Sequence, residues 1–162
     1  MAFDSTVGGA SANSYVSRTE ANAYFADRLN DEVWEAASNT TKDDALIMAT
    51  LRLDEEDYVG TRASETQNLK WPRYGVYIDG VYQASDDIPR QVKEATYEMA
   101  LALMKDITYF EDTGLEGFEN IKLGELDVTP RVRSSGILPA SVERLLGNLK
   151  TTSAYGGRLM KS

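Results

Sequence analysis

With 162 residues and 42% hydrophobic content, the chain is long enough to bury one core, so we expect a single compact domain. Its 26 acidic and 17 basic residues give a formal net charge of -9, the wrong sign for a protein that covers nucleic-acid phosphates with its whole surface. Cysteine and histidine are both absent, which excludes disulfides, thiolate zinc sites and imidazole-dependent nucleophiles, and we expect a protein that is not an enzyme.

The first 16 residues contain little apolar surface and much backbone freedom, because glycine, alanine, serine and asparagine dominate them. We therefore expect residues 1–16 to form a flexible N-terminal arm. This segment has neither the basic region nor the apolar core of a signal peptide, and no apolar run approaches the roughly 20 residues of a membrane span. The sequence predicts a protein made in the cytoplasm, with no membrane partner.

Two helices are predicted after the arm. Ser17 can cap the first, and Glu20, three residues later, completes a capping box. A short helical turn over residues 32–38 carries Trp34. The side chains expected to face the core from the first helix are Tyr24, Phe25 and Leu29.

The next predicted helix covers residues 42–60, with Thr41 as its cap and Gly60 as its stop. Its apolar stripe consists of Ala45, Met48, Ala49 and Leu53, with Leu46 and Thr50 alongside. The consecutive carboxylates of residues 54–57 could hold a hard cation or could form a solvated helix end. We favour the solvated end, because consecutive side chains point around a helix and do not converge on one ion.

Aromatic residues concentrate in residues 71–82. The segment 75–83 reads as a β-hairpin, because Asp79 and Gly80 are the pair that a type I′ turn prefers. Pro72 pushes the preceding Trp71 toward extended geometry. In the structural interpretation, Trp71, Pro72 and Arg73 form a hydrophobic joint between hairpin and helices, with Arg73 held by a nearby carboxylate.

The alternative for the same run is a platform for single-stranded DNA, on which Trp71, Arg73, Tyr74, Tyr77 and Tyr82 stack bases. Arg62, Lys70 and Arg73 would then meet phosphates. Such binding would be strong at low salt, fall steeply as salt rises and quench tryptophan fluorescence. We favour the joint, because no basic groove surrounds the aromatic residues.

A third helix is predicted over residues 86–106, with Pro89 at its first helical position. Its stripe consists of Val92, Ala95, Thr96, Met99 and Leu103. Leu101 and Met104 fall off this stripe, so the helix either lies centrally or contacts a second protein.

The remaining sequence predicts a loop over residues 111–120, a second short hairpin turning at Gly124 and a proline-started helix over residues 138–150. One face of that helix carries Val142, Leu145, Leu146 and Leu149. The fold class is thus mainly α: a compact bundle of about four helices with one or two small β-hairpin insertions and flexible N- and C-terminal arms. The expected division is an arm (1–16), a helical domain (17–149) and an extended tail (150–162).

The serial order of several motifs resembles the head-tail connector, or adaptor, proteins of tailed bacteriophages. These motifs are "SYVSRTEANAYFADRL", "KDDALIMATLRLDEEDYVG", "LKWPRYGVYIDG", "IPRQVKEATYEMALAL", "KLGELDV" and "LPASVERLL", and the resemblance covers roughly residues 14–148. Relatives of that family are sometimes labelled single-stranded-DNA-binding proteins similar to a primosomal protein. The resemblance implies a helical subunit of a dodecameric ring beneath the portal, which extends the DNA channel and joins capsid to tail.

The partners implied by this resemblance are further copies of the chain, the portal, tail or neck proteins, and double-stranded DNA passing through the channel without sequence-specific binding. Its place would be the neck of the virion. The expected portal-binding residues are Tyr155, Arg158, Leu159 and Met160, and the expected hairpin contacts to a neighbour or tail protein are Tyr77, Asp79, Gly80 and Tyr82. No catalytic residue, cofactor or metal is expected.

Overall fold

The computed structural model describes residues 2–29, 31–106, 121–123, 126–128 and 138–151. Within these ranges the helices are α1 (Arg18–Ala26), α2 (Glu32–Glu35), α3 (Asn39–Asp54), α4 (Arg90–Lys105) and α5 (Ala140–Leu146). The strands are β1 (Thr61–Arg62), β2 (Arg73–Tyr74), β3 (Tyr77–Ile78), β4 (Val81–Tyr82), β5 (Ile121–Leu123) and β6 (Leu126–Val128). They form three antiparallel pairs, β1–β2, β3–β4 and β5–β6. The prediction of a mainly α protein with small hairpins is confirmed.

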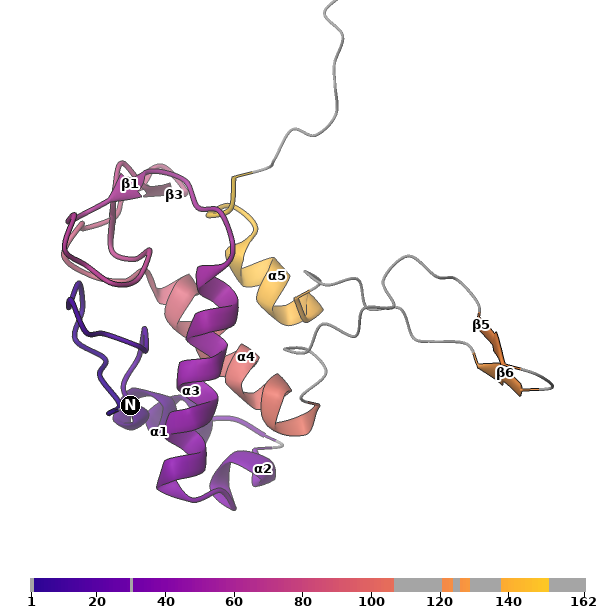
Figure 1. The fold of residues 1–162 in the computed structure, drawn as a ribbon. Helices are drawn as coiled ribbons and strands as arrows, with labels where there is room; N and C mark the ends of the chain where they lie inside the picture. The colour runs from indigo at the N-terminus through magenta and orange to yellow at the C-terminus, as the bar shows by residue number, and fades with distance from the viewer. Residues whose placement is uncertain (1, 30, 107–120, 124–125, 129–137, 152–162) are drawn as a thin grey trace, which may run out of the picture.

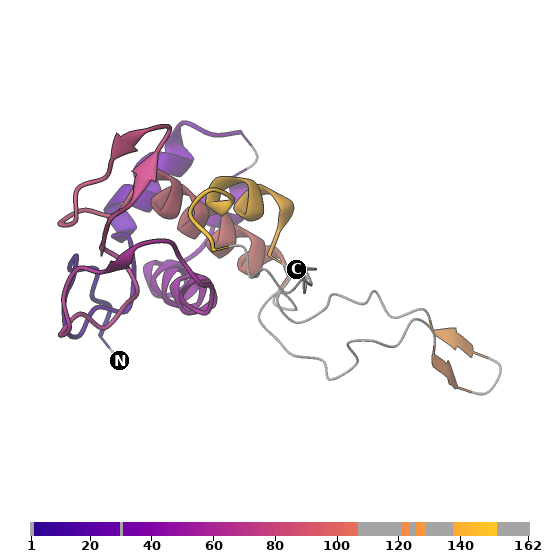
Figure 2. The ribbon, with the colours of Figure 1, turned by 90° about the horizontal axis from the view of Figure 1, so that it is seen from above.

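Helix α4 is the centre of the fold. It packs against α2, α3 and α5, and Figures 1 and 2 show α3 and α4 side by side. Its buried residues are Val92, Ala95, Thr96, Tyr97, Met99, Ala100, Leu101 and Leu103, so the predicted stripe is confirmed and a second side is buried as well. Packing within the chain therefore accounts for a helix that is apolar on more than one side.

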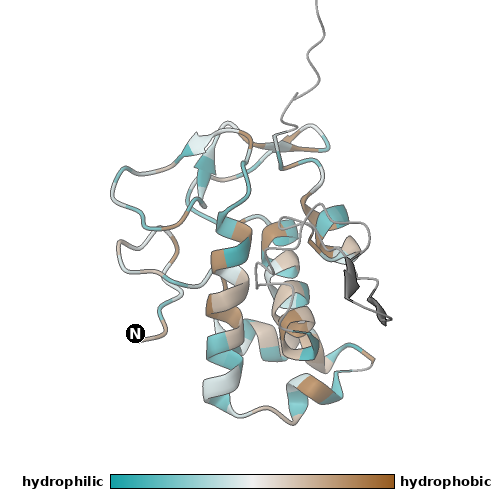
Figure 3. Ribbon diagram, turned by 45° about the vertical axis from the view of Figure 1, so that its right-hand side comes forward, coloured by the Kyte–Doolittle hydropathy of each residue, from teal (hydrophilic) through white to brown (hydrophobic). Residues whose placement is uncertain are grey.

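Helix α3 carries apolar and hydrophilic residues around its circumference (Figure 3). Ala45, Leu46, Ala49, Thr50 and Leu53 are buried, and Met48 is partly buried against the core, as its spacing predicts. In α5 and just beyond it, Val142, Leu146 and Leu149 are buried and Leu145 is partly buried.

The side chains that cap α1 and α3 determine where these two helices begin. The capping box of α1 is confirmed: the Ser17 hydroxyl accepts from the Glu20 N–H (3.2 Å), and the Ser17 N–H donates to Glu20 Oε2 (2.8 Å). For α3 the prediction was wrong, because the Ser38 hydroxyl caps the helix by accepting from the Thr41 N–H (3.1 Å). The helix also ends at Asp54 and not at Gly60.

Two expectations about side chains near α1 and α2 have different outcomes. Trp34 is buried in α2, and Phe25 is buried in α1 with Tyr24 partly buried. Leu29 is 85% exposed, so its predicted core position is wrong. The reason is that α1 ends at Ala26, and Leu29 no longer follows the helical periodicity.

The N-terminal segment differs from the expected flexible arm. Residues 12–16 are buried, and the Tyr15 N–H donates to Thr50 Oγ1 on α3 (3.1 Å). Asp4 and Asn13 bond each other twice: the Asp4 N–H donates to Asn13 Oδ1 and the Asn13 N–H donates to the Asp4 carbonyl, both at 2.8 Å. These polar residues are hydrogen-bonded in place, so a low apolar content does not prevent the segment from packing.

The hairpin predicted from Asp79 and Gly80 is confirmed. In its register Tyr77 pairs with Tyr82 and Ile78 with Val81. Asp79 and Gly80 have φ values of 50° and 78°, the left-handed backbone that both central positions of a type I′ turn require. The second predicted hairpin is also present as β5–β6, with Leu123 opposite Leu126, while Gly124 lies outside the described residues.

The end of the described chain is tied to the core. The Val59 N–H donates to the Leu149 carbonyl and the Thr151 N–H donates to the Asp57 carbonyl, both at 2.9 Å. The predicted loop 111–120 and the predicted portal residues, Tyr155, Arg158, Leu159 and Met160, lie outside the described residues. Among the helices that the structure describes, none has the length and apolar character needed to cross a bilayer.

Candidate nucleic-acid interface

Three tyrosines in the segment from β2 to β4 are exposed. Strand β3 of this segment lies at the end of the molecule where α3 finishes (Figure 1). Tyr74 is 50%, Tyr77 62% and Tyr82 48% exposed, and we call this set the exposed tyrosines. The rings of Tyr77 and Tyr82 lie edge to face, with centroids 5.4 Å apart and planes at 65°. Exposed aromatic rings on a short hairpin are a surface on which planar groups can stack.

Trp71 is not part of this surface. It is 1% exposed and packs edge to face against Tyr58, with ring centroids 5.4 Å apart. Pro72 is also buried, and the peptide bond between the two residues is cis. The structure thus places Trp71 and Pro72 where the structural interpretation expects them, and base stacking on Trp71 is wrong because its ring faces other side chains.

Arg73 completes the joint through backbone carbonyls, so the expected carboxylate partner is wrong. Its Nε donates to the Val59 carbonyl (2.7 Å), and its Nη2 donates to the carbonyls of Gly60 (2.7 Å) and Tyr58 (3.2 Å). Its Nη1 donates to the Lys70 carbonyl (3.1 Å). Partial burial lowers the pKa of Arg73. Four of its five N–H donors thus hold the backbone around β1 and β2 together.

The other two cations that the sequence places near the aromatic run differ in exposure. Lys70 Nζ donates to the Glu56 carbonyl (2.8 Å) and lies 3.5 Å from Asp57 Oδ1. Arg62 is exposed on β1, opposite Arg73, and its Nη2 donates to the Gln67 carbonyl. Of the three predicted phosphate contacts, Arg62 is therefore the one with an exposed position.

Gln67, which the sequence reasoning missed, holds the loop between β1 and β2. Its side chain is buried, and its Nε2 donates to the carbonyls of Leu69 (2.7 Å) and Pro72 (3.1 Å). Its Oε1 accepts from the Ser64 N–H (2.8 Å). A buried amide with both ends bonded fixes the loop that leads into the exposed tyrosines.

Gly60 positions Tyr74 by close backbone approach. Its φ is +75°, and a Cβ at Gly60 would lie 2.2 Å from the Tyr74 carbonyl oxygen. No side chain fits in that space. The glycine therefore sets how closely the chain after α3 passes the strand that carries Tyr74.

The carboxylates at the end of α3 do not converge on an ion. Asp54 Oδ1 accepts from the Tyr15 hydroxyl and from the Lys70 N–H (2.8 Å). Glu56 lies 3.2 Å from Arg52 Nη1 and 2.7 Å from Lys150 Nζ. Among the described residues no cluster of three or more potential metal ligands is found. The predicted solvated helix end holds for Glu55 and Asp57, which are exposed, but is wrong for Asp54 and Glu56, which bind partners distant in sequence.

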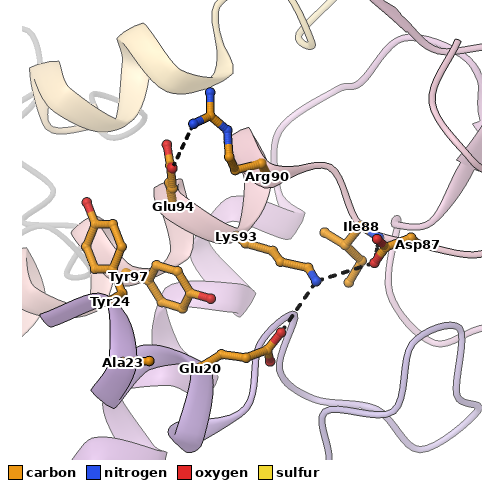
Figure 4. A pocket seen from close by; sticks show the side chains of 9 residues that line it. All are labelled: Glu20, Ala23, Tyr24, Asp87, Ile88, Arg90, Lys93, Glu94 and Tyr97. Carbon is orange, nitrogen blue, oxygen red and sulfur yellow. Dashed lines mark hydrogen bonds and ion pairs between the residues drawn. The ribbon is translucent and has the colours of Figure 1, made fainter. Parts of the chain in front are cut away.

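A pocket of about 440 Å³ lies between α1 and the start of α4 (Figure 4). Lys93 Nζ lies 3.4 Å from Glu20 Oε1 and 3.3 Å from Asp87 Oδ1, and Arg90 pairs with Glu94 at 3.7 Å. These charged side chains pair with one another within the pocket. They are therefore less available to bind a charged ligand than unpaired side chains would be.

A comparison with protein families gives one match over almost the whole chain. The model of a family described as "Putative DnaT-like ssDNA binding protein" matches residues 1–160. No curated protein and no solved structure matches the chain.

This match corrects the expectation drawn from the resemblance to head-tail connectors. Assignment to that family is wrong, and nothing supports the dodecameric ring, the portal and tail partners or the channel for double-stranded DNA. The motifs behind the resemblance include the capping pair Ser17 and Glu20 and the turn residues Asp79 and Gly80. Such residues meet local requirements of the backbone, so they carry information on the fold and little on the partner.

Proposed function

Because the chain belongs to the family of DnaT-like single-stranded-DNA-binding proteins, we propose that it binds single-stranded DNA by stacking unpaired bases on Tyr74, Tyr77 and Tyr82. The observation that carries this proposal is the exposure of all three rings within one short segment. Stacking of a base on an aromatic ring contributes about 1–3 kcal/mol and tolerates any sequence, because every base has a π face.

The proposed ligand is a single strand and not a duplex. In a duplex the faces of the bases are covered by their neighbours, so exposed rings reach them only after unstacking, which costs a few kcal/mol per base. The role is one of binding and not of catalysis, which the absence of histidine and cysteine supports.

We also propose that the helices form one compact bundle whose role is to hold this surface. The packing of α2, α3 and α5 on α4 supports this proposal, since it anchors the segment that follows α3 and the segment that precedes α4. The segment after α3 leads into β1, which pairs with the Tyr74-bearing β2, and the segment before α4 follows β4, which carries Tyr82.

The direct test is a fluorescence anisotropy titration of an end-labelled single-stranded oligonucleotide. The double variant Tyr77→Ala, Tyr82→Ala is expected to lower affinity by at least about tenfold, from the loss of two stacking rings. Leu29→Ala serves as the matched control, because it also removes an exposed apolar side chain but lies beyond α1. Equal affinity of the double variant and the wild type would contradict the proposal.

A second variant separates the tyrosines from Trp71. Trp71→Phe keeps an aromatic ring in the core, and we expect unchanged affinity with a loss of stability smaller than the about 3–5 kcal/mol typical of Trp→Ala. Both Trp34 and Trp71 are 1% exposed, so DNA bound at the tyrosines should not quench tryptophan by stacking. A loss of affinity in folded Trp71→Phe would instead place the bases at the tryptophan.

A further inference from the structure

We infer that the exposed tyrosines, if they bind single strands as proposed above, hold them through bases and hardly through phosphates. The substrate class is then base-bearing single strands, with purine-rich strands bound most tightly, and the affinity depends weakly on salt. This differs from the steep salt dependence that the sequence alone predicts for a single-stranded-DNA platform.

The first support is the charge of the segment itself. Residues 74–89, which contain the hairpin and the approach to α4, include no lysine or arginine and three aspartates, Asp79, Asp86 and Asp87. Asp79 occupies the turn between the two tyrosine-bearing strands. A phosphate that approaches the hairpin tip therefore meets a negative charge and no cation of the same segment.

The second support is the state of the neighbouring cations. Arg73 uses four of the five N–H donors of its guanidinium, and each donates to a backbone carbonyl. The Lys70 ammonium is bonded to the Glu56 carbonyl and faces Asp57. Moving either side chain to a phosphate would leave loop carbonyls without their donors, at a cost of about 1–3 kcal/mol for each buried group.

Among the three described cations that the sequence places near the exposed tyrosines, Arg62 remains available for one phosphate. It is exposed, and one of its nitrogens is bonded to the Gln67 carbonyl, which leaves further donors of the guanidinium for a ligand. One phosphate contact on a single strand corresponds to a slope of about -0.7 in a plot of log affinity against log salt. A tenfold rise in salt is then expected to weaken binding by only about fivefold.

The geometry of the rings favours large bases. Tyr77 and Tyr82 lie edge to face and each remains about half exposed or more, so a base can stack on an open face. Stacking grows with the area of overlap, and a purine covers more of a tyrosine ring than a pyrimidine does. An oligodeoxyadenosine strand is therefore expected to bind more tightly than an oligodeoxythymidine strand of equal length.

The test compares four end-labelled strands of equal length in anisotropy titrations at several salt concentrations. They are oligodeoxyadenosine, oligodeoxythymidine, an abasic sugar-phosphate strand and a methylphosphonate strand whose backbone carries no charge. We expect the abasic strand to lose binding by at least about tenfold, corresponding to the loss of a single stacked base or more. The uncharged strand should bind within about fivefold of its phosphate counterpart, because it loses only the contact with Arg62.

Two variants of the full-length chain sharpen the test. Asp79→Asn removes the charge in the turn and keeps a residue that accepts left-handed backbone, so affinity at low salt should rise by up to about fivefold and the gain should vanish at high salt. Arg62→Gln should bring the salt slope from about -0.7 to near zero.

The outcomes separate this inference from the proposed function. If no strand binds at any salt concentration, the proposed function fails, and this inference with it. If strands bind but the slope is about -2 or steeper, which corresponds to three phosphate contacts, the inference alone is overturned. Equal affinity for the abasic strand would overturn it as well, because it would show that the bases do not contribute.

Discussion

Tyr77 and Tyr82 lie opposite each other on the β3–β4 hairpin, and each ring supports the orientation of the other at a centroid distance of 5.4 Å. Cross-strand aromatic pairs contribute about 0.2–1 kcal/mol relative to an alanine pair at the same positions. The pair is therefore one preorganised unit and not two independent stacking sites.

This relationship predicts non-additive effects on binding. Tyr77→Ala and Tyr82→Ala each remove one stacking ring and the mutual support of the pair. The sum of the two single losses in binding free energy should therefore exceed the loss in the double variant by about 0.5 kcal/mol or more. Anisotropy titrations of the four proteins measure this difference. The pair Leu29→Ala and Tyr77→Ala is the control and should be additive; additivity of the tyrosine pair would show that the rings act separately.

Gly60 and Gly80 provide a matched pair for backbone strain, with φ values of +75° and +78°. Alanine at Gly80 has no atom within 4 Å of its Cβ and should cost only the left-handed backbone, about 1–2 kcal/mol. Alanine at Gly60 meets the Tyr74 carbonyl oxygen at 2.2 Å as well, so its loss in free energy of unfolding should be clearly larger. Urea denaturation of both variants measures the difference, and equal losses would mean that the loop at Gly60 moves aside.

The hydrogen bond from the Tyr15 hydroxyl to Asp54 ties the N-terminal segment to the end of α3. Burial raises the pKa of Tyr15, so its hydroxyl stays protonated and donates. Tyr15→Phe should lower the free energy of unfolding by about 1–3 kcal/mol, because it leaves one oxygen of Asp54 with fewer donors.

Removal of residues 1–16 should abolish the cooperative unfolding transition, whereas removal of a flexible arm would leave it unchanged. Circular dichroism during thermal unfolding distinguishes the two results.

Glu20 predicts a pH dependence of stability. Partial burial raises the pKa of Glu20. Its hydrogen bonds with Ser17 and the nearby Lys93 ammonium lower the pKa by more than burial raises it, so the folded-state pKa lies below the ordinary value of 4.5. Its contribution is therefore present above about pH 4.5 and lost as the pH falls through the folded-state pKa.

The variant for this prediction is Glu20→Gln, which keeps the capping box and removes the charge. Relative to wild type it should be less stable by under about 1 kcal/mol near neutral pH, as expected for a partly exposed ion pair, and the difference should disappear in acid. Glu35→Gln, an exposed carboxylate on α2, is the control. A difference that stays constant across the pH range would show that the charge of Glu20 does not stabilise the fold.

The parts of the structure that could be predicted from sequence are those decided by near neighbours in the chain. Ser17 and Glu20 form their capping box within one turn of α1, and Asp79 and Gly80 form their turn without outside help. The error at Ser38 has a related cause. Ser38 and Thr41 can both cap a helix, and the sequence alone does not decide at which of them the helix begins and which N–H groups therefore lack a partner within the helix.

The features that could not be predicted depend on partners far along the chain. Asp54 is bonded to Tyr15 and Glu56 to Lys150, so neither belongs to a solvated helix end. The backbone carbonyls around Arg73 come together only in the folded protein. Every residue has such a carbonyl, so the sequence does not indicate which ones accept from Arg73. For the candidate site, sequence identified the aromatic run and favoured a buried Trp71, which the structure shows, but it did not identify the backbone carbonyls that hold Arg73.

The core joins residues from both ends of the described chain: Val16 and Leu149 are each buried in it. On the ribosome, a nascent chain that lacks Leu149 exposes the surfaces of α4 that α5 later covers, so no early segment can complete a core of its own. Folding of this core must therefore wait until Leu149 has been synthesised. The same arrangement favours all-or-none unfolding of the described residues, because release of either Val16 or Leu149 opens the core that they share.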